Sequence, residues 1–172
     1  MNTAASPANT AANTSAFSES TVWDALSQVL DPEVPVLSVL ELGIVRGVKV
    51  HARGVHVVVT PTYSGCPATE VIQDAIRSAL FDAGATSVSV ELQYAPAWTT
   101  DWISAQAAEK LRRYGIAAPH AVQPLRFHPR SIPCPRCAST RTEQLSAFGS
   151  TACKSLYRCL ACREPFEYFK PI

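Results

Sequence analysis

The chain has 172 residues, of which 47% are hydrophobic and 17% charged, and its formal net charge is +1. These totals fit a soluble protein with a real core, made of one ordinary domain or of a small domain plus a metal-stapled appendage. They give no indication of a nucleic-acid or membrane partner, and no apolar run reaches the roughly 18–20 residues that span a bilayer.

The first 18 residues are rich in Ala, Asn, Ser, Thr and Pro without periodicity, which predicts a disordered tail. They lack the basic start and the apolar stretch of a signal peptide, and they contain no Arg, which argues against a transit peptide. We therefore expect a cytoplasmic protein. In a reducing cytosol, clustered cysteines bind metal more often than they form disulfides.

The first predicted element after the tail is an amphipathic helix. Ser20 or Thr21 can cap its start, and Asp31-Pro32 ends it, because the residue before proline disfavours helical dihedral angles. Its apolar face consists of Val22, Trp23, Leu26, Val29 and Leu30. The stretch Asp31-Pro32-Glu33 then forms a rigid, acidic corner.

The following segments complete a small α+β unit. Two β-branched runs, 44–52 and 55–60, predict a hairpin, and 67–84 keeps helical spacing up to a glycine that suits a C-terminal cap. Residues 86–94 alternate as a third strand, and 101–114 predict a closing helix. The order α-β-β-α-β-α indicates a three-stranded sheet with helices, in the α+β class.

The uneven distribution of charge supports a division into two units. Residues 1–125 carry 7 Lys/Arg and 11 Asp/Glu, whereas 126–172 carry 8 and 3. We predict a tail at 1–18, the α+β domain at 19–115, a proline-containing linker at 116–131 and a metal ribbon at 132–172.

The ribbon prediction depends on four cysteines in two CxxC pairs: Cys134, Cys137, Cys159 and Cys162. A two-residue gap lets both thiolates of a pair face one ion, and two such pairs close a tetrahedral site, typical of a zinc ribbon. Because the predicted ribbon is too short to bury enough apolar surface alone, we expect the metal to supply its folding energy. Iron fits the same thiolates, and the spacing does not separate the two metals.

Residues beside the ribbon ligands have less specific interpretations. Arg136, Arg158 and Arg163 can offset the negative charge of four thiolates on a dication. Cys153 lies off the CxxC pattern, and we interpret it as a side chain of the hairpin, with a substitute ligand or a reactive thiol as alternatives.

The sixth cysteine, Cys66, stands apart in the stretch PTYSGCPATE, between a strand and the helix that Pro67 begins. Free N–H groups and the positive end of a helix stabilise a thiolate at such a position. The alternative is that Cys66 is buried as a small hydrophobic residue.

Other loops can bring polar and aromatic side chains to Cys66. The strand ends of this topology can gather Asp31, Glu33, Cys66, Trp98 and Asp101 at one edge. The aspartates can equally be helix caps, and Trp98 a core residue. The chain shows no motif of a nucleophile with a base and no phosphate-binding loop, so we do not expect a self-sufficient enzyme.

Three stretches, DPEVPVLSVLELGIV, TPTYSGCPA and APAWTTDWI, resemble the small domain of SufT-type iron–sulfur assembly factors. The stretch FGSTACKSLYRCLACREPFEYFK behind CPRC resembles the PaaD family, the D subunits of the phenylacetyl-CoA 1,2-epoxidase system. Together the two resemblances cover about residues 20–172. The long Ala/Asn/Ser/Thr tail is where this chain departs from the family pattern.

The resemblance implies an accessory role in aerobic phenylacetate degradation, where a monooxygenase system with a di-iron oxygenase and a reductase epoxidises the ring. Cys66, Asp31 and Glu33 match the cysteine and the acidic corner of the assembly factors, which implies transient binding of iron or of an iron–sulfur cluster. The four ribbon cysteines would hold a structural zinc ion. The implied partners are the oxygenase and reductase subunits, with no nucleic acid and no membrane.

Two alternatives to iron loading stay open. The chain can be a structural or docking subunit of the oxygenase without metal transfer, or a ribbon-based nucleic-acid binder, against which the acidic N-terminal domain argues. The sequence does not decide whether the chain forms a homodimer.

Overall fold

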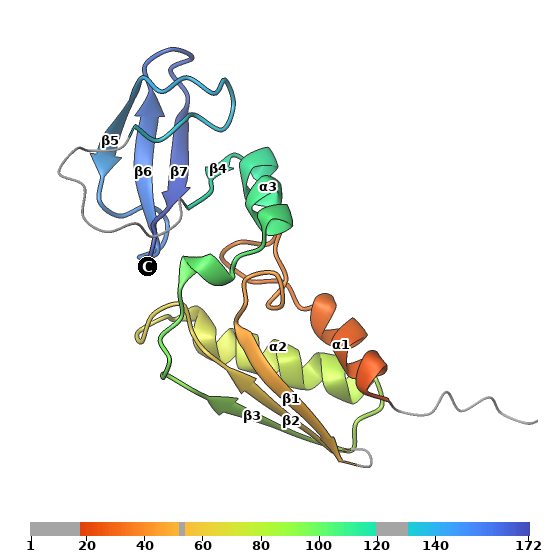
Figure 1. Ribbon diagram of the computed structural model, residues 1–172. Coiled ribbons are helices and arrows are strands. Elements are labelled where there is room, and N and C mark those ends of the chain that lie inside the picture. The colour runs from red at the N-terminus through yellow and green to blue at the C-terminus, as the bar shows by residue number, and fades with distance from the viewer. Residues whose placement is uncertain (1–17, 52–53, 120–130) are drawn as a thin grey trace, which may run out of the picture.

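The computed structural model describes residues 18–51, 54–119 and 131–172, so the expected tail and most of the expected linker lie outside it. The described part forms an N-terminal α/β unit and a C-terminal all-β unit (Figure 1). In chain order the elements are α1 (Glu19–Ser27), β1 (Val45–His51), β2 (Gly54–Val59), α2 (Ala68–Asp82), β3 (Ser87–Leu92), the 3₁₀ helix η1 (Thr100–Trp102), α3 (Ala105–Tyr114), β4 (Ile116–Ala117), β5 (Thr142–Ser146), β6 (Lys154–Cys159) and β7 (Pro165–Phe169).

The N-terminal unit is built on a three-stranded sheet of order β1-β2-β3. β1 and β2 form the predicted antiparallel hairpin, and β3 returns parallel to β2 after α2. Val55, Val57 and Val59 alternate along β2 and lie in one core with Ile76 and Leu80 of α2, which covers that face of the sheet (Figure 1). The predicted α+β class is confirmed.

The boundaries of two helices differ from the sequence-based expectation. Ser18, rather than Ser20 or Thr21, caps α1, because its Oγ accepts a hydrogen bond from the Thr21 N–H at 3.3 Å. The chain leaves the helix after Ser27, and Leu30, expected on the apolar face, is 49% exposed and forms an isolated β-bridge with Ser38.

The expected helix over 101–114 is wrong as one element and is divided in two. Residues Thr100–Trp102 form η1, and Ile103 is extended with ψ 122°. Ser104 then caps α3 by accepting from the Ala107 N–H at 3.1 Å, and Gly115 ends it with a φ of 97°. A second capping side chain in the middle of the segment therefore restarts the helix.

The C-terminal unit is a four-stranded sheet of order β4-β7-β6-β5. β5, β6 and β7 are antiparallel, as in a zinc ribbon. β4 comes from the end of the N-terminal unit and pairs with β7 in parallel, Ile116 opposite Glu167. Ile116–Ala117 stand at the start of the segment that we expected to be a linker, and here they belong to the ribbon sheet.

The two units share a hydrophobic core at their junction. Phe169, at the end of β7, is 1% exposed, and its ring centroid lies 6.0 Å from that of Trp98. Cys153, which directly precedes β6, belongs to the same cluster of buried residues. The Thr100 N–H also donates to the Ile172 carbonyl at 3.2 Å, so the C-terminus is tied to η1 beside the junction (Figure 1).

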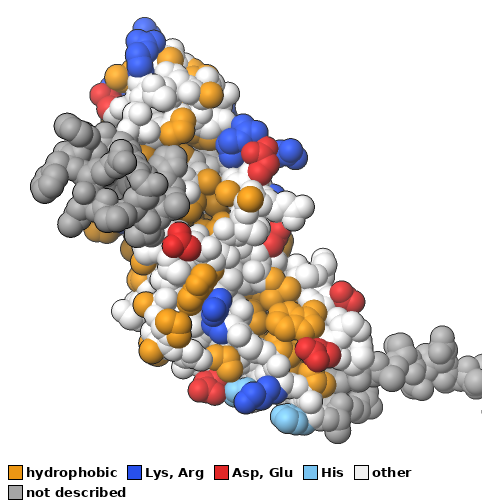
Figure 2. Space-filling view, in the orientation of Figure 1, with side chains coloured by type: hydrophobic (Ala, Val, Ile, Leu, Met, Phe, Trp, Pro, Cys, Tyr) orange, Lys and Arg blue, Asp and Glu red, His pale blue; other side chains and the backbone are white. Residues whose placement is uncertain are grey.

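Charged side chains of both signs are mixed on the face of the molecule that Figure 2 shows. They are interspersed among hydrophobic and uncharged ones. Among the described helices, none is both long enough and apolar enough to cross a membrane.

Replacing Phe169 with Ala should destabilise the chain by about 3–5 kcal/mol, because the variant leaves a cavity in the shared core. Chemical denaturation would measure the change in the free energy of unfolding. Phe148→Ala is the matched control: Phe148 is 64% exposed, and its loss should cost under about 1 kcal/mol. Equal effects of the two substitutions would contradict the junction core.

Candidate metal centre and cysteine loop

The four ribbon cysteines converge on one point. The Sγ atoms of Cys134, Cys137, Cys159 and Cys162 all lie within 4.8 Å of one another. The Cys134–Cys162 and Cys137–Cys159 Sγ distances are 3.7 Å and 3.6 Å. A tetrahedron with metal–sulfur bonds of about 2.3 Å has edges of about 3.8 Å, so the thiols fit a tetrahedral zinc or iron ion.

Local backbone geometry turns each CxxC pair toward this point. The residue after each second cysteine has a positive φ, 58° at Ala138 and 66° at Arg163, which folds the chain back sharply. The Cys162 N–H points at the Cys159 Sγ at 3.5 Å. This hydrogen bond to the sulfur is the main reason why the pKa of Cys159 is lowered to about 6, which favours the thiolate that a metal requires.

Two of the three arginines expected to balance the thiolates have glutamate partners. Arg136 Nη1 lies 3.5 Å from Glu164 Oε1, and Arg158 forms an ion pair with Glu143. Their positive charge is therefore shared with carboxylates at the exposed surface of the ribbon, and these exposed pairs contribute little to stability.

Cys66 lies in a tight turn directly before α2. Its N–H donates to the Tyr63 carbonyl at 3.2 Å, and its own carbonyl accepts from the Thr69 N–H at 3.2 Å. Pro67 occupies the N-cap position of α2 and makes no side-chain capping hydrogen bond. The half-buried Cys66 side chain thus stands beside the N-terminus of a 15-residue helix, where the helix dipole favours negative charge.

Asp31 is buried on the neighbouring loop, where it caps the acidic corner. Its Oδ1 accepts from the N–H groups of Glu33 at 2.9 Å and Val34 at 2.8 Å, and the residue is 6% exposed. Burial raises the pKa of Asp31, although these two hydrogen bonds and Lys154 partly oppose the shift.

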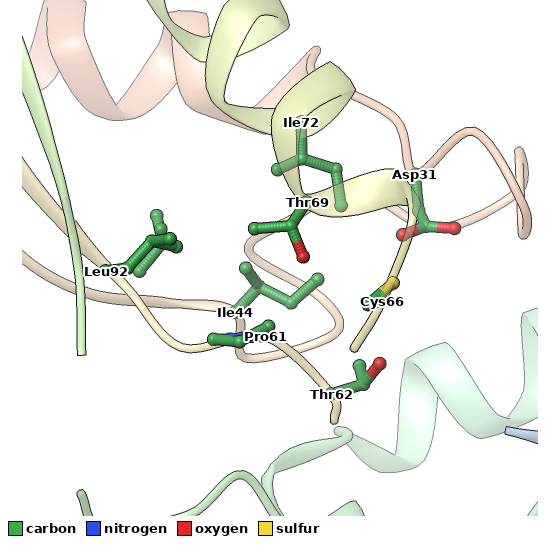
Figure 3. A pocket seen from close by; sticks show the side chains of 9 residues that line it. Asp31, Ile44, Pro61, Thr62, Cys66, Thr69, Ile72 and Leu92 are labelled. Atoms are coloured by element: carbon green, nitrogen blue, oxygen red, sulfur yellow. The ribbon is translucent and has the colours of Figure 1, made fainter. Parts of the chain in front are cut away.

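Asp31 and Cys66 line the same small hollow (Figure 3). Its walls are otherwise mostly apolar, with Ile44, Val59 and Ile72 among them. In the close-up, the sulfur of Cys66 and the carboxylate of Asp31 come from different loops and face the same opening beside α2. A thiol and a carboxylate that line one hollow can together bind a thiophilic cation.

Residues of the ribbon lie beside the loops that carry this site, which the sequence did not indicate. Lys154 Nζ is 3.4 Å from the Glu33 carbonyl oxygen, and Cys153 belongs to the buried cluster against which Cys66 packs. Burial raises the pKa of the Cys153 thiol, which lies 3.0 Å from Thr151 Oγ1. The spacing of six residues between Cys153 and Cys159 did not predict this position of Cys153. Only the packing of the ribbon against the N-terminal unit brings Cys153 near the Cys66 loop.

The remaining candidates have other surroundings. Glu33 is next to Asp31 in the corner, and burial followed by repulsion from Asp31 raises its pKa. Trp98 is 3% exposed and donates from Nε1 to the Leu42 carbonyl at 2.9 Å, as a core residue would. Asp101 is exposed in η1, and no contact in the described part of the chain joins it to Cys66.

Comparison with known proteins gives matches for both units. Residues 118–170 match the family described as the PaaD zinc beta ribbon domain, and residues 19–92 match the family described as iron-sulfur cluster assembly protein. Both resemblances seen in the sequence are thereby confirmed.

Individual relatives show the same two-part likeness. The putative D subunit of the 1,2-phenylacetyl-CoA epoxidase of Escherichia coli (strain K12) is 54% identical over 151 residues, 88% of this chain and 92% of that protein. The Fe-S protein maturation auxiliary factor of Bacillus subtilis is 35% identical and that of Porphyromonas gingivalis 36% identical to this chain. Each match covers 50% of this chain, together with 85% of the Bacillus subtilis protein and 83% of the Porphyromonas gingivalis protein.

Substituting Cys134 by Ser should abolish binding of the ribbon ion and make the ribbon sensitive to protease, because metal binding supplies its folding energy. Native mass spectrometry and limited proteolysis would measure both effects. Cys153→Ser, which removes a cysteine outside the tetrahedral set, should retain one ion per chain. Loss of the ion from this control would make Cys153 a ligand.

Asp31→Ala should cost about 1–3 kcal/mol, since it removes the acceptor of two N–H groups, whereas Asp31→Asn keeps an acceptor oxygen. The folded-state pKa of Asp31 lies above 3.8, so its carboxyl contributes most to stability below pH 3.8. That contribution is lost as the pH rises through the raised pKa. Denaturation between about pH 4 and pH 7 should therefore show a fall in wild-type stability that is smaller in Asp31→Asn. If the unfolding free energies of wild type and Asp31→Asn changed with pH in parallel, a raised pKa of Asp31 would be contradicted.

Proposed function

Because the chain belongs to the family of the phenylacetyl-CoA epoxidase D subunits, we propose that it matures its partner subunits by supplying iron or an iron–sulfur cluster. It acts as an accessory protein of aerobic phenylacetate catabolism rather than as the catalyst. The observation that carries the proposal is the shared hollow of Cys66 and Asp31, within the segment that matches iron–sulfur assembly proteins.

The contrast between the two cysteine sites supports a division of labour. Four thiols can enclose an ion in the ribbon and leave no coordination position free, which is typical of a permanent structural zinc site. Cys66 offers a single thiol, with the carboxylates of Asp31 and Glu33 as further donors. Fewer donors hold a metal less tightly, and a site that delivers metal must also release it.

The partners in this proposal are the oxygenase and reductase subunits of the epoxidase. The ribbon provides a docking surface, since it exposes Leu145, Phe148 and Leu160 to 49%, 64% and 47%. The face in Figure 2 does not favour a nucleic-acid partner, because acidic and basic groups are mixed on it.

A docking role without metal transfer is the alternative. The name of the Escherichia coli relative, which makes that protein one subunit of an epoxidase, and the exposed apolar residues of the ribbon favour it. This alternative predicts stable, stoichiometric association with the oxygenase that does not depend on Cys66.

Cys66→Ser should leave the fold and the ribbon ion intact but lower the iron content of co-expressed oxygenase and reductase subunits at least severalfold, because the delivering thiol is gone. Metal analysis of the purified partners, after anaerobic co-expression, would measure this. Ser64→Ala, an exposed change in the same loop, is the matched control. Full iron content and activity in the Cys66→Ser strain would refute metal transfer and leave the docking role.

A further inference from the structure

Lys154, the first residue of β6, is a buried cation at the junction of the two units. It is 2% exposed, and its Nζ lies 2.9 Å from Glu167 Oε2 and 3.4 Å from the Glu33 carbonyl oxygen. Removing an ammonium group from water is costly unless partners compensate it. The ribbon thus brings a positive charge, with its counter-charge, to the backbone of the acidic corner.

Glu167 is held in place for this pairing. Its Oε1 accepts from the Ser150 N–H at 2.6 Å, and a Cβ at Gly149 would come within 2.6 Å of the same oxygen. Burial pushes the pKa of Glu167 upward, but the hydrogen bonds from Lys154 and Ser150 outweigh it, and the pKa is lowered. Lys154 therefore has a fixed, ionised partner on one side and the acidic corner on the other.

The charge of Lys154 lies close to the carboxylate of Asp31. Lys154 Nζ is 3.4 Å from the Glu33 carbonyl oxygen, and Asp31, which lines the hollow with Cys66, accepts at Oδ1 from the N–H of the same Glu33 at 2.9 Å. A divalent cation that binds this carboxylate would meet a resident positive charge that it cannot displace into water, because β6 and β7 hold it there.

We propose that Lys154 is a built-in counter-ion that weakens the hold of the Cys66 site on a divalent metal ion and so permits its release. The inference rests on the proposed function, which makes that site a transient metal site. Like charges repel strongly across a partly buried site. The ribbon would then lower the metal affinity of the Cys66 site in addition to packing against the N-terminal unit.

The test is a comparison of single charge changes in the full-length, zinc-loaded chain. Lys154→Met should bind Fe²⁺ about tenfold more tightly and release it more slowly to a chelator, because the repelling charge is gone. Glu167→Gln should bind Fe²⁺ more weakly, since Lys154 then lacks its counter-charge. The double variant should bind Fe²⁺ more tightly than wild type but less tightly than Lys154→Met, because the positive end of the pair, which faces the acidic corner, is gone. Lys154→Arg, which keeps the charge, should match wild type. Anaerobic titration with Fe²⁺ alone measures the affinities.

The outcomes separate the inference from the proposed function. Equal affinities in the single variants and wild type, or shifts of both in the same direction, would overturn the counter-ion role, because a purely structural pair would loosen the site in either variant. If Lys154→Met does not fold, Glu167→Gln and the double variant still decide. If Cys66→Ser binds Fe²⁺ as wild type does, the proposed function fails, and the counter-ion role fails with it.

Discussion

The C-terminal unit depends on four converging sulfur atoms as well as on a small hydrophobic core, whose buried members include Ile132, Phe166 and Tyr168. A segment as short as residues 132–172 buries too little apolar surface to fold alone, and a tetrahedral ion is the cross-link that holds its two CxxC pairs together. The strand β6 begins at the unit junction and ends at the ligand Cys159. An ion bound by the four cysteines at one end of β6 would therefore also help to fix Cys153 and Lys154 beside the N-terminal unit at the other end.

The two cysteine sites have opposite physical designs. In the ribbon, thiols alone face one point, and an N–H group supports the charge of Cys159. At Cys66 the candidate donors are a thiol and a carboxylate, which come from separate loops and line one hollow. The first design favours permanent retention of one ion, and the second favours exchange with solvent or with a partner protein.

Sequence reasoning predicted the parts of this protein that depend on local spacing. The CxxC pairs fix their own geometry, and the alternation of Val55, Val57 and Val59 identifies a strand with one buried face. The start of α2 next to Cys66 likewise follows from Pro67. The first residues of α1 and α3 were less predictable, because several Ser and Thr residues near each start could act as the N-cap.

What the sequence did not indicate depends on contacts between distant segments. Nothing local marks Ile116–Ala117 as a strand, since their partner β7 lies about 50 residues further along the chain. Lys154 resembles any lysine of a surface hairpin, and only its burial between Glu167 and Glu33 gives it a role. Candidate residues such as Asp31 were visible as a motif, whereas their charged surroundings were not.

The parallel pairing of β4 with β7 has a mechanical consequence. A domain tethered at one point can swivel about its tether, but the ribbon is fastened at its entrance through β4 and at its exit through the Thr100–Ile172 hydrogen bond. Two separated attachment points remove most of that rotational freedom. A partner protein that binds the ribbon would therefore also fix the orientation of the Cys66 hollow relative to itself.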